Sequence, residues 1–242
     1  MGYNTNEHEI GAMQTVKFLD EHIEFFYEEI GPERYKQNAP SDVINSYKGK
    51  LPETLLTYWK EYGWCGYGNG VFWTVNPDEY KSVVSEWLKD TPFQDCDNYY
   101  LIAIGGFGEM FLWGEKTGPS LTITASYGMI FPTDKKLSIQ ESGGMEFLMK
   151  LFFSGIDKED LDVKDNEDKP LFERARVLLG ELKPGEIYGF SPALIMGGEA
   201  DIKHLKRVNA VAHLHLLAAL GEKMIMKDIV KEINENNETG LM

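Results

Sequence analysis

The sequence has few cysteines and no long uninterrupted run of apolar residues. Cys65 and Cys96 are the two cysteines among 242 residues, and two thiols without clustered histidines do not make a zinc site. No stretch reaches the roughly 20 uncharged apolar residues that a membrane helix needs. The N-terminal residues 1–4 lack the basic and apolar regions of a signal peptide. We therefore expect a cytoplasmic protein without membrane contact, in which both cysteines are reduced structural thiols.

Basic residues are scarce relative to acidic ones. The chain has 24 Lys and Arg residues against 39 Asp and Glu residues, which gives a formal net charge of −15. Residues 1–168 carry the whole imbalance, because residues 169–242 hold ten acids and ten bases. Nucleic-acid binding depends on Lys and Arg contacts to phosphate, so we expect no direct binding of nucleic acid. A basic protein partner is the alternative, although an acidic surface can also serve solubility alone.

Motifs for catalysis, metal binding and cofactor binding are missing. His213 and His215 lie two apart on an expected helix and point about 200° apart, so they cannot bind one metal ion. Ser126, Ser154 and Ser191 lack the Gly-x-Ser-x-Gly elbow of a nucleophile. We predict no catalytic residue, no metal site and no cofactor.

The glycine-rich segment 105–108 permits two interpretations. Consecutive glycines can form a nest of N–H groups that binds an anion. The segment leads toward another expected strand, however, whereas dinucleotide and phosphate-binding loops lead into a helix. A hairpin turn is therefore favoured. The nearby Glu109 and Glu115 could do acid–base chemistry only if they face each other across a cleft.

Periodicity predicts an α+β fold class for the first two thirds of the chain. Apolar residues at helical spacing predict helices at 13–30, from Ser41, at 51–62, at 76–88 and at 145–153. Asn76 is a helix-capping residue and Gly63 a terminating one. Short β-rich runs predict a strand at 71–75 and further strands at 99–104, 110–114, 121–124 and 127–131. These last four indicate an antiparallel β-meander sheet packed with helices.

The last third of the chain begins with an acidic stretch. Residues 157–168 hold seven acids against two bases, which favours a solvated connection. The stretch lacks the central Gly and the terminal Glu of a calcium-binding EF-hand loop. We predict an α+β domain at 1–156, an acidic connection at 157–168 and a smaller, mainly helical domain at 169–242.

Within that smaller domain, four features are expected from the pattern. A helix starts at Pro170, and short extended pieces follow at 188–196. Asp201 caps a strongly apolar helix at 202–220, which Gly221 ends. An amphipathic helix at 224–233 closes the pattern.

Aromatic residues crowd sixteen positions around a glycine-rich turn. They are Tyr58, Trp59, Tyr62, Trp64, Tyr67, Phe72 and Trp73. Most are expected in the core, because large rings dominate burial. Exposed Tyr and Trp beside Gly and Asn are also typical of protein-binding surfaces, so both interpretations stay open for individual rings.

Several short motifs occur in a fixed order along both halves of the chain. In the first half they are Leu51-Pro52-Glu53, Tyr58-Trp59, Tyr62-Gly63-Trp64, Gly68-Asn69-Gly70, Phe72-Trp73, Asn76-Pro77-Asp78-Glu79-Tyr80, residues 112–118 and residues 128–132. In the second half they are residues 171–175, Tyr188-Gly189-Phe190, Pro192-Ala193-Leu194 and Gly197-Gly198. In these motifs the sequence resembles the immunity proteins that bind DNase toxins of type VI secretion, which pair a GAD-like domain with a C-terminal immunity domain. The resemblance covers nearly all of residues 15–221.

The resemblance implies a non-enzymatic protein that binds and neutralises a cognate secreted nuclease toxin as a monomer or weak homo-oligomer. It supplies no catalytic residue and no toxin-contact motif. Candidate contact residues are therefore chosen by charge and by the exposed-turn interpretation: Tyr67, Asn69, Glu109, Glu115, Asp157, Glu159, Asp160 and Asp162. The alternative is a small-ligand-binding or regulatory protein with a pocket between the two domains.

Overall fold

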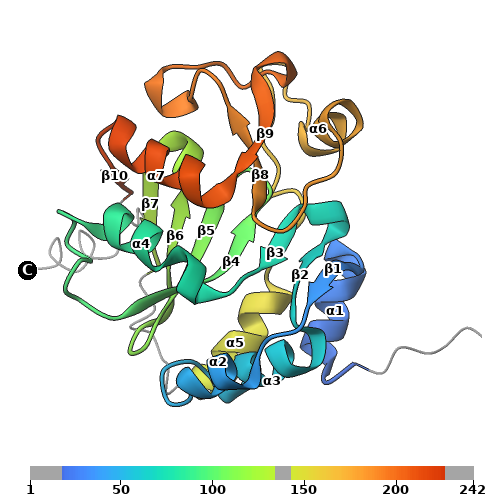
Figure 1. Ribbon diagram of the computed structural model, residues 1–242, viewed down its shortest axis with the longest axis vertical. Helices are drawn as coiled ribbons and strands as arrows, with labels where there is room; N and C mark the ends of the chain where they lie inside the picture. The colour runs from blue at the N-terminus through green and yellow to red at the C-terminus, as the bar shows by residue number, and fades with distance from the viewer. Residues whose placement is uncertain (1–17, 134–142, 227–242) are drawn as a thin grey trace, which may run out of the picture.

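The computed structural model describes residues 18–133 and 143–226 (Figure 1). Its α-helices are α1 (Glu21–Ile30), α2 (Ser41–Ser46), α3 (Glu53–Tyr62), α4 (Pro77–Leu88), α5 (Gly144–Ser154), α6 (Phe172–Leu179) and α7 (Ala210–Leu220). Its strands are β1 (Glu33–Gln37), β2 (Trp64–Tyr67), β3 (Phe72–Thr74), β4 (Tyr99–Gly105), β5 (Glu109–Gly114), β6 (Gly118–Thr124), β7 (Met129–Pro132), β8 (Glu186–Phe190), β9 (Leu205–Asn209) and β10 (Met224–Ile225). Short 3₁₀ turns are η1 (Gly68–Gly70), η2 (Ala125–Tyr127), η3 (Leu194–Met196) and η4 (Ile202–His204).

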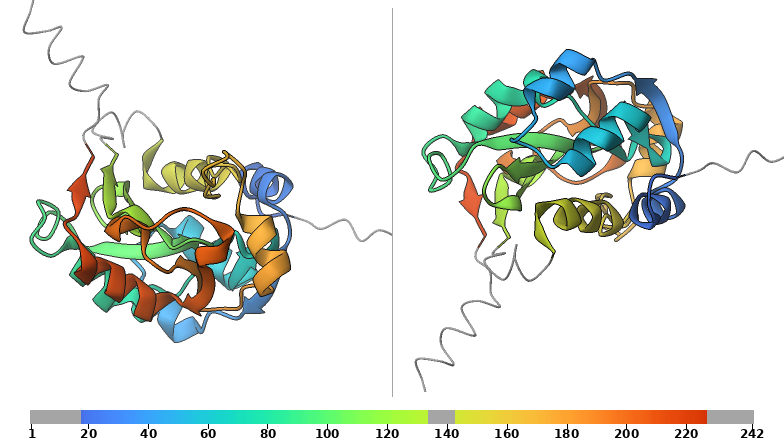
Figure 2. Two further views of the ribbon diagram at one scale, coloured as in Figure 1. Left: turned by 90° about the horizontal axis from the view of Figure 1, so that it is seen from above. Right: turned by 90° about the horizontal axis from the view of Figure 1, so that it is seen from below.

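An eight-stranded sheet forms the centre of the molecule. Its strand order is β1-β2-β3-β4-β5-β6-β7-β10, and a second sheet holds β8 and β9. Neighbouring strands are antiparallel except for β10, which runs parallel to β7. Helices α1 and α5 cover one face of the large sheet, and α4 and α7 cover the other (Figure 2). The predicted α+β fold, with its β4–β7 meander and a smaller helical C-terminal part, is confirmed.

Local signals set the ends of α3 and α4 where the sequence predicts them. Gly63 ends α3 with a φ of 72°, a conformation that favours glycine. The side chain of Asn76 accepts a hydrogen bond from the N–H of Asp78 and so caps α4. Both signals lie within a few residues of the helix end that they determine, which is why they can be read from sequence.

The first helix starts later than predicted. It begins at Glu21 instead of residue 13, because the Asp20 carboxylate accepts hydrogen bonds from the N–H groups of His22 and Ile23 and caps the helix there. Residues 13–17 of the predicted helix lie outside the described residues. The second helix begins at Ser41 as predicted, although Pro40 occupies the capping position.

The predicted single helix at 202–220 is wrong in its first half. Ile202–His204 is a 3₁₀ turn, Leu205–Asn209 is β9, and the helix α7 starts only at Ala210. Strand β9 pairs with β8 along its whole length, from Glu186↔Asn209 to Phe190↔Leu205. The side chain of Asn209 then accepts a hydrogen bond from the N–H of Ala212, so Asn209 caps the helix in place of Asp201.

The predicted helix at 224–233 is also wrong at its start, since Met224 and Ile225 form β10 at the edge of the large sheet. The main-chain N–H of Met224 donates to the Gly128 carbonyl, and that of Met226 donates to the Ile130 carbonyl. Residues 227–233 of that prediction lie outside the described residues. The pairing of β10 with β7 joins the end of the described chain to the first-half sheet.

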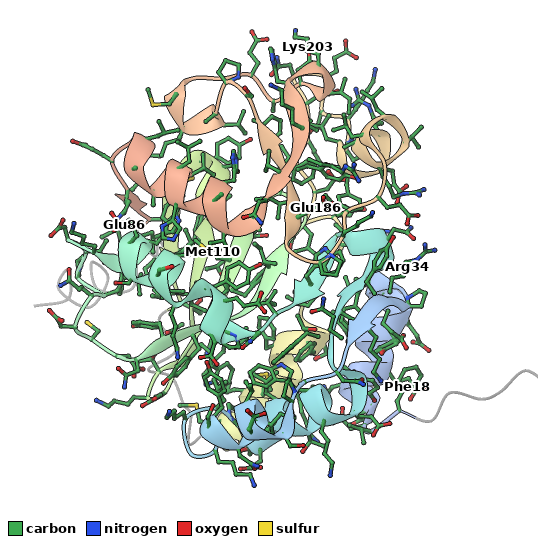
Figure 3. All side chains as sticks on the ribbon, viewed as in Figure 1. Phe18, Arg34, Glu86, Met110, Glu186 and Lys203 are labelled. Carbon is green, nitrogen blue, oxygen red and sulfur yellow. The ribbon has the colours of Figure 1, made fainter. Side chains whose placement is uncertain are left out.

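One hydrophobic cluster contains residues from both halves of the chain. Side chains fill the space on either side of the sheet, with the fully buried Met110 at its centre (Figure 3). The indole N–H of Trp87 on α4 donates to the Leu214 carbonyl on α7, at 3.1 Å. The domain boundary at 157–168 stays a prediction, and the parts on either side of it share this core. No helix in the described ranges has the length and apolar content to cross a membrane.

Candidate partner-binding site

The eight predicted contact residues lie in separate places, and one close acidic pair stands out among them. Glu109 begins β5 and lies near Asp160 of the acidic connection. Partial burial and then the Asp160 charge raise the pKa of Glu109 to about 7, against a hydrogen bond from Thr124 that lowers it. The fold therefore holds the Glu109 carboxylate in a half-buried place beside a second negative charge.

Glu115 lies at the other end of β5 and already has hydrogen-bond donors. The Tyr100 hydroxyl and the Asn98 side-chain amide both donate to its carboxylate. Glu115 follows Glu109 by six positions, which is roughly 20 Å at the rise of a strand. The two carboxylates do not face each other, so this pair does not meet the geometric condition for acid–base catalysis.

The acidic connection contains two kinds of carboxylate. Asp157, Glu159 and Asp160 are exposed. Asp162 is partly buried, and its Oδ1 accepts hydrogen bonds of 3.0 and 2.9 Å from two successive N–H groups at the start of α6. Leu171 occupies the capping position of α6 but has no side-chain acceptor. Asp162, nine residues earlier in the chain, therefore caps this helix. The first three residues are available to a partner, and Asp162 serves the fold.

Tyr67 and Asn69 differ in accessibility. Tyr67 is 1% exposed and packs in the core, with its ring 4.9 Å from that of Phe26. Asn69 is half-buried with a φ of 62°, and its side-chain amide lies 3.5 Å from a Glu173 carboxylate oxygen on α6. All seven aromatic residues around the glycine-rich turn are buried, which agrees with the core interpretation of that cluster. A partner would reach Asn69 before Tyr67.

The glycine-rich segment is a hairpin turn between β4 and β5, as predicted. The N–H of Gly106 donates to the Val71 carbonyl, and the N–H of Tyr188 donates to the Gly106 carbonyl, both at 2.8 Å. The N–H of Gly108 donates to the Gly105 carbonyl at 2.9 Å. Two of the N–H groups that an anion-binding nest would use are therefore already bonded within the protein.

The histidine pair on α7 and the cysteines fit their structural interpretations. His215 Nε2 lies 3.0 Å from the Ser82 hydroxyl on α4, and burial lowers the pKa of His213.

Cys65 is buried and Cys96 is exposed, and neither forms a disulfide. Burial raises the pKa of the Cys65 thiol to about 11, which keeps it protonated. Within residues 18–133 and 143–226, no three His, Cys, Asp or Glu side chains gather as metal ligands.

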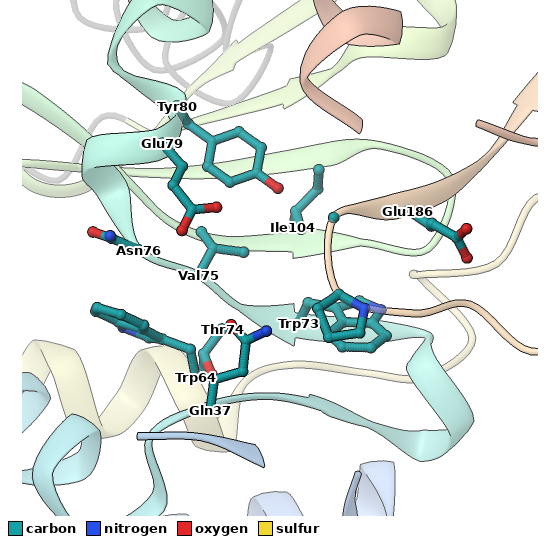
Figure 4. Close-up of a pocket in the computed structure, with 12 residues that line it drawn as sticks. Gln37, Trp64, Trp73, Thr74, Val75, Asn76, Glu79, Tyr80, Ile104 and Glu186 are labelled. Atoms are coloured by element: carbon teal, nitrogen blue, oxygen red, sulfur yellow. The ribbon is translucent and has the colours of Figure 1, made fainter. Parts of the chain in front are cut away.

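A cavity that the sequence did not reveal lies between the large sheet, the start of α4 and the loop before β8 (Figure 4). Its volume is about 160 Å³. The lining residues are Gln37, Trp64, Trp73, Thr74, Val75, Asn76, Glu79, Tyr80, Ile104, Pro184, Gly185 and Glu186. These residues come from segments far apart in the chain, so no local pattern marks them as a group.

The first turn of α4 supplies the polar groups that point into this cavity. Figure 4 shows the Glu79 carboxylate and the Tyr80 hydroxyl directed toward the open space. Burial raises the pKa of Tyr80, so its hydroxyl stays protonated. The Glu186 carboxylate points away from the cavity (Figure 4) and accepts a hydrogen bond from the N–H of Lys183, with Arg207 Nη1 3.8 Å away. Glu79 is therefore the carboxylate that this cavity presents.

A second hollow beside Glu115 has a volume of about 250 Å³ and is more open. Its lining also holds Lys50 and two further carboxylates, those of Glu53 and Glu146. The Glu146 carboxylate accepts hydrogen bonds from the N–H groups of Glu53 and Thr54. Glu146 thus caps α3, whose own capping residue is a proline without a side-chain acceptor. The carboxylates of Glu115 and Glu146 therefore already have donors within the protein, and Lys50 lines the same hollow, whereas no basic side chain lines the cavity at Glu79.

Comparison with known protein families identifies two consecutive segments. Residues 21–127 match the GAD-like domain, and residues 147–221 match the family described as T6SS immunity protein Tdi1, C-terminal. The chain belongs to the two-domain family of type VI secretion immunity proteins. The second match begins inside α5, before the acidic connection, and so includes that connection.

A solved structure supports the fold of this immunity-family chain. The crystal structure of Atu4351 from Agrobacterium tumefaciens superposes with a TM-score of 0.72 at 23% sequence identity, covering 82% of this chain and 89% of that one. At this identity the likeness shows a shared fold. No curated protein matches the chain with significant sequence similarity.

The cavity at Glu79 lies at the junction of the two family segments of the chain. Nine of its lining residues, Gln37 to Ile104, belong to the GAD-like match, and Pro184 to Glu186 belong to the second match. Both segments are therefore needed to form its walls.

Proposed function

We propose that this protein binds and neutralises a cognate toxin delivered by type VI secretion, in the cytoplasm and without catalysing a reaction. The observation that carries the proposal is the match of residues 147–221 to the C-terminal segment of an immunity protein. Neutralisation by binding needs a surface complementary to the toxin and no set of reacting groups. The separation of Glu109 from Glu115 along β5 is consistent with this mode of action.

The toxin we propose is a DNase. An enzyme that binds the DNA backbone presents Lys and Arg to phosphate, and this chain carries a net charge of −15. The exposed carboxylates of Asp157, Glu159 and Asp160 are suited to occupy such a basic cleft in place of phosphate. Opposite potentials on the two proteins also accelerate their encounter, an effect that salt weakens.

Co-expression with the protein encoded by the neighbouring gene tests the proposal. We expect the neighbour alone to kill the host and degrade its DNA, and the pair to be harmless and to co-purify. We also expect nanomolar or tighter binding, weakened by salt mainly through the association rate. A harmless neighbour, or one that kills despite this protein, would contradict the immunity function.

A second candidate function is the binding of a small ligand in a regulatory protein. The cavity at the junction of the two segments favours this candidate, because that is where such a pocket is expected. Its volume of about 160 Å³ weighs against it, since pockets for drug-sized ligands are on the order of 300–1,000 Å³. Gene order separates the candidates, because an immunity gene is expected beside a toxin gene.

A further inference from the structure

The cavity at the start of α4 has the chemistry of a receptor for one cationic side chain. We propose that it binds the guanidinium group of an arginine, and that the arginine belongs to the toxin. The identity of the partner rests on the proposed immunity function. The preference for a guanidinium rests on the cavity itself.

The Glu79 carboxylate is the charged group that the polar lining of the cavity offers to a ligand. A guanidinium carries five N–H donors and no acceptor, so it needs several acceptor atoms around it. The Glu79 carboxylate and the Tyr80 hydroxyl point into the cavity, and the side-chain amide of Gln37 on β1 lies on the opposite side of it (Figure 4). None of the residues on its lining is Lys, Arg or His. A cation entering the cavity therefore meets the Glu79 carboxylate and no basic side chain of the lining.

Glu79 differs from its neighbour Asp78 in having a free carboxylate. Asp78 pairs with Lys81 and accepts a hydrogen bond of 2.8 Å from the Tyr47 hydroxyl. Within the described ranges, Glu79 forms no ion pair and its carboxylate accepts no hydrogen bond from another side chain. An unpaired carboxylate at a cavity entrance is available to a partner's charge, whereas Asp78 is committed to the fold.

Apolar walls make the cavity more suitable for arginine than for lysine. Trp64, Trp73 and Ile104 are each less than 9% exposed and surround the space with hydrophobic surface. A guanidinium is more weakly hydrated than an ammonium group and loses less on leaving water. The planar group also forms several directed hydrogen bonds at once.

The position of the cavity favours a protein side chain as its occupant. Glu79 is exposed, so the polar side of the cavity is open to solvent. The net charge of −15 complements a basic protein. A volume of about 160 Å³ suits one side chain entering from a partner's surface.

A titration of the full chain with arginine amide tests the guanidinium site without the toxin. In ¹⁵N-labelled protein, we expect saturable shifts of the Trp64 and Trp73 indole N–H signals. Citrulline amide has nearly the same shape without the charge and should bind about tenfold more weakly, because charge-assisted hydrogen bonds are lost. Lysine amide should also bind more weakly. Equal binding of citrulline amide or lysine amide would overturn the guanidinium assignment.

Two variants and a matched control assign the binding to the cavity. Glu79→Gln keeps the side-chain shape and should weaken arginine amide binding about tenfold. Gln37→Glu adds a carboxylate beside the same space and should strengthen it severalfold. Glu21→Gln makes the same charge change in the first turn of α1 and should have no effect. Unchanged affinity in both cavity variants, with intact indole spectra, would contradict the proposal.

Binding of the toxin itself tests the source of the arginine. We expect Glu79→Gln to raise the dissociation rate of the complex about tenfold, with Glu21→Gln as wild type. If the wild type neutralises the toxin and Glu79→Gln dissociates at the wild-type rate, the toxin is not the source and the immunity function stands. If arginine amide binds at the cavity while no toxin is neutralised, the immunity function fails and the guanidinium site stands.

Discussion

Phe107 and Phe190 stack with ring centroids 6.0 Å apart and ring planes 19° apart, although they belong to different family segments of the chain. Phe107 lies in the turn between β4 and β5, and Phe190 ends β8. The Phe107 ring also contacts those of Phe172 and Tyr188 and is 5% exposed. A turn of the first-half sheet therefore inserts its aromatic side chain into the core of the second segment.

Replacing Phe107 with alanine should destabilise the whole chain. We expect Phe107→Ala to lower the free energy of unfolding by about 3–5 kcal/mol, because it leaves a cavity between the two segments. Urea denaturation measures this loss. Val177→Ala, at a side chain that is 80% exposed, serves as the control and should change the free energy by less than about 0.5 kcal/mol. A loss as small as the control's would show that the two segments do not depend on this contact.

Asp162 should matter for stability, unlike its neighbour Glu159. We expect Asp162→Ala to lower the free energy of unfolding by about 1–2 kcal/mol, because two N–H groups at the start of α6 lose their acceptor. Glu159 is exposed, so Glu159→Ala should stay near wild type. Thermal unfolding of the two variants makes the comparison. Equal melting temperatures would refute the capping role.

Charge reversal in the acidic connection should slow binding of the toxin without affecting the fold. The change is made at Asp157, Glu159 and Asp160, which are exposed, and leaves Asp162 in place. We expect an association rate lower by about tenfold at low salt, because electrostatic steering is weakened. Stopped-flow mixing at several salt concentrations measures it. An unchanged rate would remove the connection from the interface.

Stability should depend on pH through Glu109. Its pKa of about 7 in the folded protein lies above the ordinary value of 4.5, so the folded state holds the proton more tightly than the unfolded state does. Protonation of Glu109 therefore contributes to the free energy of unfolding in full below about pH 4.5, and this contribution is lost as the pH rises through 7. Glu109→Gln should therefore be more stable than wild type at pH 8, and the difference should shrink toward pH 5. Urea midpoints at both pH values test this, and a constant difference would contradict the raised pKa.

Cleavage of the acidic connection should leave the two parts associated. A protease site inserted after residue 160 would cut an exposed position, and the shared cluster around Phe107 and Trp87 should hold the fragments together. We expect co-elution in size-exclusion chromatography, with separation only in denaturant. Spontaneous separation into two folded fragments would support fully independent domains.

Elements with local signals were predictable from the sequence. The caps of α3 and α4 and the glycine turns of the β4–β7 meander involve residues a few positions apart, and they are where the sequence predicts them. Strand β1 was missed because every residue of it is exposed and it has no apolar alternation. Its strand conformation comes from pairing with β2. The helix predicted over β9 is wrong because pairing with β8 overrides the apolar pattern that continues into α7.

The candidate site was less predictable than the fold. The charge pattern predicted Asp157, Glu159 and Asp160 as contact residues, and the structure places them on the surface. The same pattern predicted Asp162, which instead caps α6. The cavity at Glu79 had no sequence signal of its own, although its Asn76–Tyr80 stretch is one of the motifs on which the family resemblance rests. Sequence patterns show which residues share a helix face or a strand face, and they do not show which distant segments meet.

The sequence alone determined the charge, the α+β class and most helix ends, because these depend on composition and on interactions over a few residues. It also carried the family resemblance, which resides in the order of short motifs. Only the tertiary structure decided that Phe107 packs in the second segment, that Asp162 is a cap, and that Glu79 and Tyr80 face the loop at Pro184–Glu186. These relationships join residues far apart in the chain, and their contacts form only when burial of the shared core brings the segments together.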